Sequence, residues 1–250
     1  MEAMDRIIGY SNIKNELIRI KDILINTEIY RKLGADMPHG LLLYGAPGVG
    51  KTLMAISFIK DCKVPYYICR KSKSGDNLLE DIKKVFEEAA QNEKAIVLLD
   101  DMDKFSNTDS RYTDTQEYVT IQTCIDSVKE KNVYVTATVN SLCNLPQSLL
   151  RSGRFDNVLE VSTPRGRDAE LIIEHYIKNK HFDSSVDIKN IARLMVGKSC
   201  ADLETVTNEA AICAGYRRGE SICMDDFMEA FLRMASKTEI AGMGGDEDDF

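Results

Sequence analysis

The first part of the chain alternates between short apolar runs and longer amphipathic stretches. Five runs rich in apolar, β-branched or aromatic residues predict strands at 40–44, 64–69, 95–99, 133–138 and 158–161. Apolar positions at helical spacing predict helices at 11–32, 53–59 and 78–89, with another that ends near Lys129. Strands that alternate with helices in this way predict a parallel α/β sheet with helices on both faces.

The pattern changes after Pro164, where only helical periodicity remains. Further helices are predicted at about 171–177, 188–195, 201–214 and 224–234. We therefore predict an α/β domain at residues 1–163 and a small helical domain at 164–238. Residues 239–250 are rich in glycine and acidic residues, which predicts a disordered tail, with docking of Phe250 on a partner as the alternative.

The loop after the first predicted strand has the chemistry of a phosphate-binding loop. Residues 45–52 read Gly-Ala-Pro-Gly-Val-Gly-Lys-Thr and match G-x-x-x-x-G-K-[ST], between a strand and a helix as the motif requires. Glycines let backbone N–H groups converge on anionic oxygens, and the helix N-terminus adds its positive dipole end. Lys51 offers a charge for the outer phosphates and Thr52 a hydroxyl for Mg²⁺. A chance glycine-rich turn is the alternative.

Two carboxylates, Asp100 and Asp101, follow the third predicted strand. Beside a phosphate-binding loop, a carboxylate at the end of a strand is the expected partner of Mg²⁺. We therefore predict that Thr52 and Asp100 hold the metal. An ordinary turn at the end of a strand is the alternative for both carboxylates.

Composition narrows the range of functions. A formal net charge of −8 disfavours a partner held mainly by electrostatic attraction, such as nucleic acid or an anionic membrane. The seven cysteines form no C-x-x-C pair, which favours free thiols in a reducing compartment. The N-terminus lacks an apolar signal core, and no apolar run approaches the ~18 residues that span a bilayer. We expect a cytoplasmic protein without a membrane segment.

These motifs, in this order, resemble the AAA family of ATPases, and in particular the ATPase modules of Cdc48-type remodelers and membrane-anchored AAA metalloproteases. The resemblance covers about residues 5–235. Besides the phosphate-binding loop it rests on five segments, at 33–40, 99–103, 137–140, 149–156 and 199–211. It implies a P-loop NTPase sheet with a small C-terminal helical lid, ATP or ADP with Mg²⁺, and a homo-oligomeric, hexameric ring. The chain has no His-Glu-x-x-His protease motif.

The resemblance also implies roles for single residues. Asp101 would polarise the attacking water, Asn140 would orient it, and Arg151 and Arg154 would reach the γ-phosphate bound by a neighbouring subunit. The residues that would contact the nucleotide are Ile7, Ile8, Gly45, Pro47, Gly48, Val49, Gly50, Lys51, Thr52, Leu53, His175, Cys200 and Ala201. Plain core packing is the alternative for the pairs at 7–8 and 200–201, and an ordinary packed or exposed helical residue for His175.

Four departures from the family pattern bear on function. Asp101 replaces the usual glutamate and is shorter by about 1.5 Å, one carbon–carbon bond. Residues 70–76 are basic and lack the aromatic residue that grips polypeptide in the family, and we interpret them as a solvated loop. The family's Asp-Gly-Phe signalling segment is missing near 128–130, and Ile8 replaces a small residue.

Two functions remain in competition. The first is an ATP-hydrolysing module that assembles as a ring and remodels an unidentified protein partner. The alternative is a slowly hydrolysing, nucleotide-dependent switch or scaffold that does not translocate polypeptide. A nucleic-acid motor is disfavoured by the charge and by the absence of aromatic residues among the basic ones in the loop.

Overall fold

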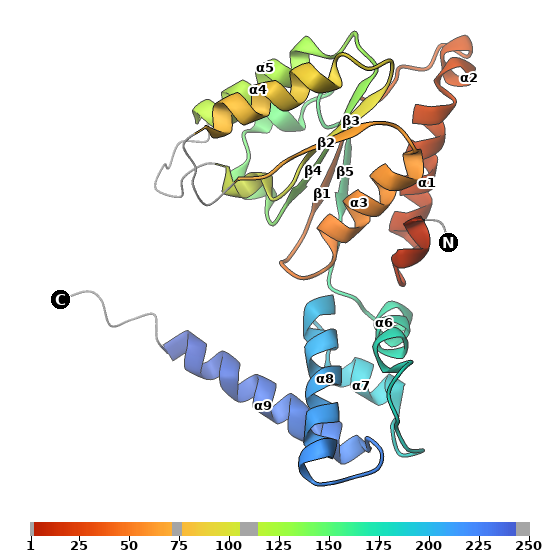
Figure 1. Cartoon of the computed structure of the whole chain (residues 1–250), viewed down its shortest axis with the longest axis vertical. Coiled ribbons are helices and arrows are strands. Elements are labelled where there is room, and N and C mark those ends of the chain that lie inside the picture. The colour runs from red at the N-terminus through yellow and green to blue at the C-terminus, as the bar shows by residue number, and fades with distance from the viewer. Residues whose placement is uncertain (1–2, 72–76, 106–114, 244–250) are drawn as a thin grey trace, which may run out of the picture. The chain divides into compact units, whose positions relative to one another are not determined.

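The computed structural model of the chain describes residues 3–71, 77–105 and 115–243 (Figure 1). Its contacts divide the chain into two compact units, Met1–Ser162 and Thr163–Phe250. The first unit contains a parallel sheet covered by helices, and the second is helical. The fold class predicted from the sequence is confirmed.

The sheet of the first unit has five parallel strands in the order β2-β3-β4-β1-β5. Their bounds are β1 Gly40–Tyr44, β2 Tyr66–Cys69, β3 Ala95–Leu99, β4 Val133–Val139 and β5 Asn157–Glu160. Because every strand runs the same way, the loops that follow β1, β3 and β4 leave the sheet at one edge. The phosphate-binding loop, Asp100 and Asn140 all lie at this edge.

Helices cover both faces of the sheet, with α4 and α5 on one side and α1 and α3 on the other (Figure 1). The helical bounds in this unit are η1 Ala3–Arg6, α1 Ser11–Ile25, α2 Thr27–Lys32, α3 Lys51–Cys62, α4 Leu78–Ala89, η2 Met102–Lys104, α5 Gln116–Ser127, η3 Leu142–Asn144 and η4 Gln147–Leu150. The helix predicted at 11–32 is interrupted at Asn26, which separates α1 from α2. The segment 106–114, expected to be a loop, lies outside the described residues.

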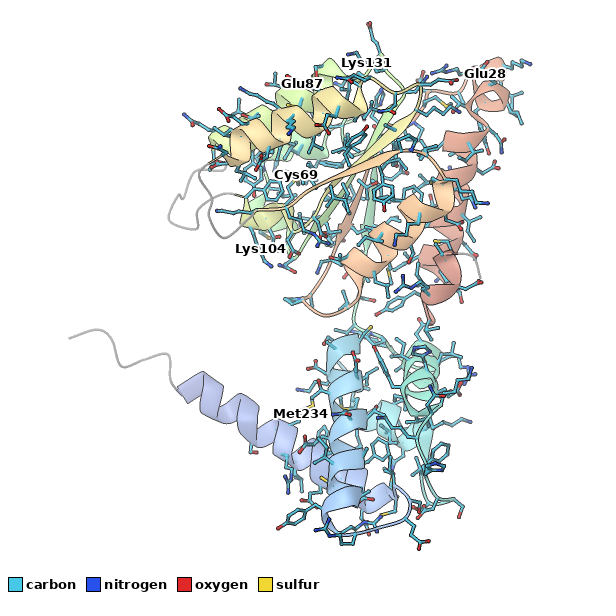
Figure 2. The ribbon with its side chains drawn as sticks, in the orientation of Figure 1. Glu28, Cys69, Glu87, Lys104, Lys131 and Met234 are labelled. Atoms are coloured by element: carbon cyan, nitrogen blue, oxygen red, sulfur yellow. The ribbon has the colours of Figure 1, made fainter. Side chains whose placement is uncertain are left out.

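The core follows from the apolar strands. Strands β1, β3 and β4 are almost wholly buried, so they present apolar side chains to both helical layers. Ile82 and Phe86 of α4 pack into the core on one face. Cys69 at the end of β2 joins the same core (Figure 2). On the other face the ring of Phe58 in α3 meets that of Tyr134 edge-on, at 6.3 Å between centroids. Two packed layers hold the sheet and its loop-bearing edge in place.

The second unit consists of α6 Arg167–Ile177, α7 Ile188–Leu194, α8 Cys200–Tyr216 and α9 Met224–Met243. Ser199 caps α8 through a reciprocal capping box with Asp202. Helix α9 extends to Met243, past the boundary at 238 predicted from the sequence. The rest of the expected tail, residues 244–250, lies outside the described residues.

An ion pair between the exposed Arg217 and the buried Asp226 joins the end of α8 to the start of α9. Arg217 donates through Nε and one terminal nitrogen to both carboxylate oxygens of Asp226, each at 2.7 Å. Asp226 also accepts the backbone N–H of Cys223 at 2.8 Å, and only 3% of its side chain is exposed. The hydrogen bonds from Arg217 hold the pKa of Asp226 well below its usual range.

We predict that Asp226→Asn lowers the free energy of unfolding at neutral pH by roughly 1.5–3 kcal/mol, the usual worth of a hydrogen bond to a charged group. Because the folded-state pKa of Asp226 is depressed, its stabilisation is present above the unfolded pKa of about 3.9 and is lost as pH falls below it. In urea unfolding, the difference in free energy of unfolding between parent and variant should therefore be larger at pH 7 than below pH 4.

Glu229→Gln is the matched control, because it removes the carboxylate of an exposed pair with Arg233 on α9. Its effect should stay within about 1 kcal/mol. A difference between parent and Asp226→Asn that does not shrink in acid would contradict the role given to the ion pair.

Candidate active site

The phosphate-binding loop is a tight turn between β1 and α3 that requires glycine at two positions. Gly45 has a φ of 151°, and a Cβ there would lie 2.1 Å from the carbonyl oxygen of Val161. Gly50, just before α3, has a φ of 98°. Both backbone conformations disfavour other residues. The loop therefore leads directly into the N-terminus of α3, where Lys51 is the first helical residue.

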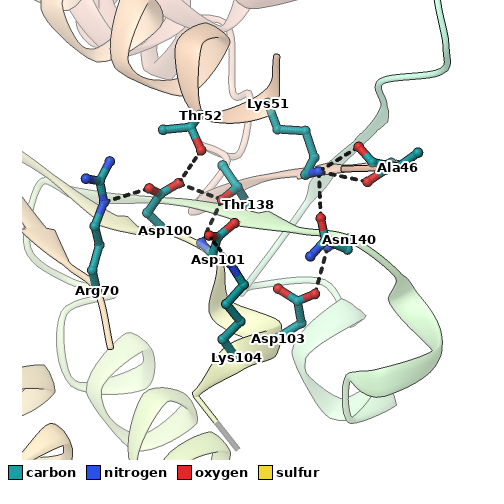
Figure 3. A network of polar contacts seen from close by, with 11 residues as sticks. Ala46, Lys51, Thr52, Arg70, Asp100, Asp101, Asp103, Lys104, Thr138 and Asn140 are labelled. Carbon is teal, nitrogen blue, oxygen red and sulfur yellow. Dashed lines mark hydrogen bonds and ion pairs between the residues drawn. The ribbon is translucent and has the colours of Figure 1, made fainter. Parts of the chain in front are cut away.

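Lys51 is buried, with 6% of its surface exposed, and its ammonium group is fully engaged. Its Nζ donates to the carbonyl oxygens of Gly45 at 2.8 Å and Ala46 at 3.0 Å, and to Oδ1 of Asn140 at 2.9 Å (Figure 3). Burial lowers the pKa of Lys51, while the nearby carboxylates at 100, 101 and 103 oppose that shift. The structure thus brings Lys51 and Asn140, separated widely in sequence, into direct contact.

Asp100 is the centre of a second set of contacts at the same edge. Its Oδ1 accepts the hydroxyls of Thr52 and Thr138, each at 2.8 Å. Its Oδ2 forms an ion pair with Arg70, with 2.7 Å between this oxygen and Nε (Figure 3). The two residues predicted to hold Mg²⁺, Thr52 and Asp100, therefore touch each other.

The donor set suits Mg²⁺, which prefers oxygen ligands and keeps waters and substrate phosphates in its shell. A hydroxyl and a carboxylate 2.8 Å apart, at the N-terminus of α3, provide the protein's share of such a shell. Among the residues that the structure describes, no group of three or more His, Cys, Asp or Glu side chains could hold a metal ion. Phosphate oxygens would have to complete the coordination.

Asp101 has left-handed backbone geometry, with a φ of 54°. Its N–H donates to Oγ1 of Thr138 at 2.8 Å, and its carboxylate pairs with Nζ of Lys104 at 2.7 Å. The hydrogen bond between Lys104 and the carboxylate of Asp101 raises the pKa of Lys104. Next to it, Asp103 accepts the backbone N–H of Asn140 at 3.0 Å. The predicted catalytic carboxylate is therefore at the site, and it is held by a lysine of its own chain.

The two arginines predicted to act on a neighbouring subunit differ in their surroundings. Arg154 donates to both oxygens of Asp126, at 2.7 and 3.3 Å, and to the carbonyl of Ser148 at 2.6 Å, with 18% of its side chain exposed. The hydrogen bonds that Arg154 donates to Asp126 lower the pKa of this carboxylate to about 2. Arg151, which follows η4, is exposed. That both arginines reach a neighbouring subunit stays a prediction; within its own chain Arg154 is bonded to Asp126 and Ser148, whereas Arg151 is exposed.

The remaining predicted nucleotide contacts have mixed surroundings. In the first unit Ile7 and Val49 are buried, Ile8 is half-buried, and Leu53 is 40% exposed; Pro47 and Gly48 are exposed in the loop. In the second unit His175 is exposed on α6, Cys200 is half-buried at the start of α8, and Ala201 is exposed.

Four polar residues at this site escaped the sequence interpretation: Arg70, Asp103, Lys104 and Thr138. Thr138 lies inside a β-branched run that suggested only a strand. Arg70 belongs to the loop predicted to be solvated, and it is 54% exposed, but its guanidinium group is also bonded to Asp100. The rest of that loop, residues 72–76, lies outside the described residues.

Comparisons with known proteins agree with this geometry. Residues 41–163 match the model of the "ATPase family associated with various cellular activities (AAA)", and residues 185–229 match an AAA+ lid domain. Together the two matches cover more than half of the chain. The chain belongs to the AAA family of ATPases, as its sequence motifs suggested.

Curated relatives include proteins named ATP-dependent zinc metalloprotease FtsH. The one from Malacoplasma penetrans is 32% identical over 252 residues, covering 95% of this chain and 31% of the relative. The one from Mycoplasmopsis synoviae is 34% identical over 233 residues, covering 88% of this chain and 35% of the relative. The chain thus spans about a third of the length of these relatives. Family and relatives support nucleotide binding and ATP hydrolysis.

We predict that Lys51→Ala weakens ATP binding roughly 100-fold, because the phosphates lose charge-assisted hydrogen bonds worth about 1.5–3 kcal/mol each. Isothermal titration calorimetry on the folded variant would measure the change. Lys60→Ala is the matched control, since Lys60 is an exposed lysine in the last turn of the same helix. Affinity equal to that of the parent in Lys51→Ala would exclude this loop as the phosphate site.

Proposed function

We propose that the chain is a Mg²⁺-dependent ATPase module that assembles as a ring and remodels a protein partner. The observation that supports this best is the joined set of contacts among Lys51, Asn140, Thr52 and Asp100. These residues come from α3 and from the ends of β3 and β4, and they converge on one loop. Among the described residues, the ammonium group of Lys51 bonds to two carbonyl oxygens and an amide oxygen and to no carboxylate, which leaves its positive charge for an anion.

The chain's own residues would divide the work of hydrolysis. Backbone N–H groups of the loop would bind phosphate oxygens, and Lys51 would exchange the carbonyls of Gly45 and Ala46 for them. Thr52 and Asp100 would hold Mg²⁺, which when bound neutralises charge on the phosphates. Asn140 would orient the attacking water, and Asp101 would polarise it and accept its proton.

Slow hydrolysis is the second candidate, and the pairing of Asp101 with Lys104 favours it. A carboxylate that is one methylene shorter than glutamate and bonded to an ammonium group at 2.7 Å must leave that partner to reach water. Misplacement on the order of 1 Å can slow catalysis ~10²-fold. A nucleotide-dependent switch or scaffold would tolerate such a rate, whereas a translocating motor would not.

Arg151 is the residue that we propose to act across a subunit interface. It is exposed, and it lies on the segment that carries the finger residues in the family. Arg154 would serve a different purpose, because its bonds to Asp126 and Ser148 fix this segment to α5 and η4. Removal of Arg154 would then impair the action of Arg151 indirectly, by displacing the segment that carries Arg151.

Assembly, metal and location are parts of the same proposal. Within the described parts of the chain, none of the helices has the length and hydropathy needed to cross a membrane. The cytoplasmic location and the hexameric ring expected from the sequence remain predictions, as do the unidentified protein partner and the absence of nucleic acid.

We expect Asp101→Asn to abolish steady-state phosphate release while ATP still binds, because the amide cannot accept a proton from water. Asp101→Glu should match or exceed the parent, since its longer side chain restores reach. Glu93→Gln, at the opposite end of β3, is the matched control and should not change the rate. Phosphate release by Asp101→Asn at the parental rate would show that Asp101 is only a turn residue at the end of the strand.

Specific activity should rise with protein concentration if Arg151 acts in trans, because a finger is worth about 10³–10⁵ in rate in other phosphoryl-transfer systems. Arg151→Ala should bind ATP and hydrolyse it poorly, whereas Arg165→Ala, another exposed arginine, should behave as the parent. A mixture of Arg151→Ala with Lys51→Ala should regain activity, because intact fingers then meet intact loops.

Mixtures that demonstrably co-assemble and yet show no rescue would disprove the role of Arg151 across subunits. Activity independent of concentration would do the same.

A further inference from the structure

The carboxylate predicted to hold Mg²⁺ is already bonded to a cation of its own chain. Arg70 donates through Nε to Oδ2 of Asp100 at 2.7 Å (Figure 3). The other oxygen accepts two hydroxyl hydrogen bonds, from Thr52 and Thr138. Asp100 is therefore surrounded by three donors, with only 5% of its side chain exposed, and one of those donors carries a full positive charge.

The register of the sheet fixes Arg70 in this place. In the parallel pair of β2 and β3, Cys69 lies opposite Leu99, and the N–H of Asp100 donates to the carbonyl of Cys69 at 3.0 Å. The residue that follows each strand therefore leaves the sheet at the same edge, and Arg70 comes beside Asp100. Strand pairing therefore places the two residues side by side, within reach of the ion pair that the structure shows.

The cavity beside Asp100 is lined mainly by cationic side chains. This cavity is lined by Arg70, Lys71, Lys104, Asp100 and Asp101, so three positive side chains face two negative ones. The ammonium group of Lys104 is bonded to Asp101, as Arg70 is to Asp100. Both carboxylates of the proposed mechanism are thus paired with a cation.

We propose that Arg70 competes with Mg²⁺ for Asp100 and so reduces the contribution that the metal makes to nucleotide affinity. This inference rests on the proposed function, in which Thr52 and Asp100 hold the metal. A guanidinium group bonded to Asp100 repels a dication that approaches the same carboxylate. It also compensates the buried negative charge when no metal is bound. The chain therefore binds nucleotide with comparatively little help from the metal.

The test compares nucleotide affinity with and without metal. A fluorescent N-methylanthraniloyl derivative of ADP is titrated with the full chain in excess EDTA and in saturating Mg²⁺. The dissociation constant in EDTA divided by the dissociation constant in Mg²⁺ measures the contribution of the metal, independently of turnover. Arg70→Gln should raise this ratio about tenfold, a moderate change because Arg70 is 54% exposed and solvent screens its charge. Arg70→Lys retains the charge and should leave the ratio near the parental value.

Lys71→Gln is the matched control. It removes the same charge one residue along, from a side chain whose Nζ donates to the carbonyl of Phe105 at 3.4 Å and not to Asp100, and should raise the ratio much less than Arg70→Gln does. An unchanged or lower ratio in Arg70→Gln would overturn the proposal, and so would an equal rise in Lys71→Gln. A parent chain that binds the probe in neither condition would refute the proposed function itself, and the inference with it.

Discussion

One buried carboxylate, Asp100, connects the parts of the sheet edge on which the site depends. It bonds to Thr52 at the start of α3, to Thr138 in β4 and to Arg70 after β2, while its own backbone continues β3. A buried charge is tolerated only when its hydrogen bonds are satisfied, so these three partners are held in place together. The loop that leads into α3 is thereby fixed relative to the strand ends that carry Asp101 and Asn140.

Much of the fold was predictable from the sequence, because the signals are local. Uninterrupted apolar runs marked β1 and β3 as strands covered on both faces, and the glycine-lysine-threonine motif marked the loop. The interruption of the first predicted helix at Asn26 had no clear signal. The prediction that Thr52 and Asp100 share a metal rests on the loop motif and on the position of Asp100 at the end of a strand, and the two side chains do lie in contact.

The rest of the site depends on which strands are neighbours, and the sequence does not specify this. Arg70 meets Asp100 because β2 lies beside β3, and Thr138 meets it because β4 lies on the other side. Arg154 bonds to Asp126 on α5, a contact that no local pattern indicates. The scaffold is thus shared with the AAA family, while the ion pairs of Arg70 with Asp100 and of Lys104 with Asp101 are contacts that local patterns did not identify.

Steady-state phosphate release from ATP, measured for the parent chain in Mg²⁺ and in excess EDTA, tests the central claim most directly. We expect measurable release in Mg²⁺ at protein concentrations that allow assembly, and none above the rate of spontaneous hydrolysis in EDTA. The same rate in both conditions, or no release in Mg²⁺ from a chain that binds ATP, would contradict the claim that Thr52 and Asp100 hold a metal that supports hydrolysis.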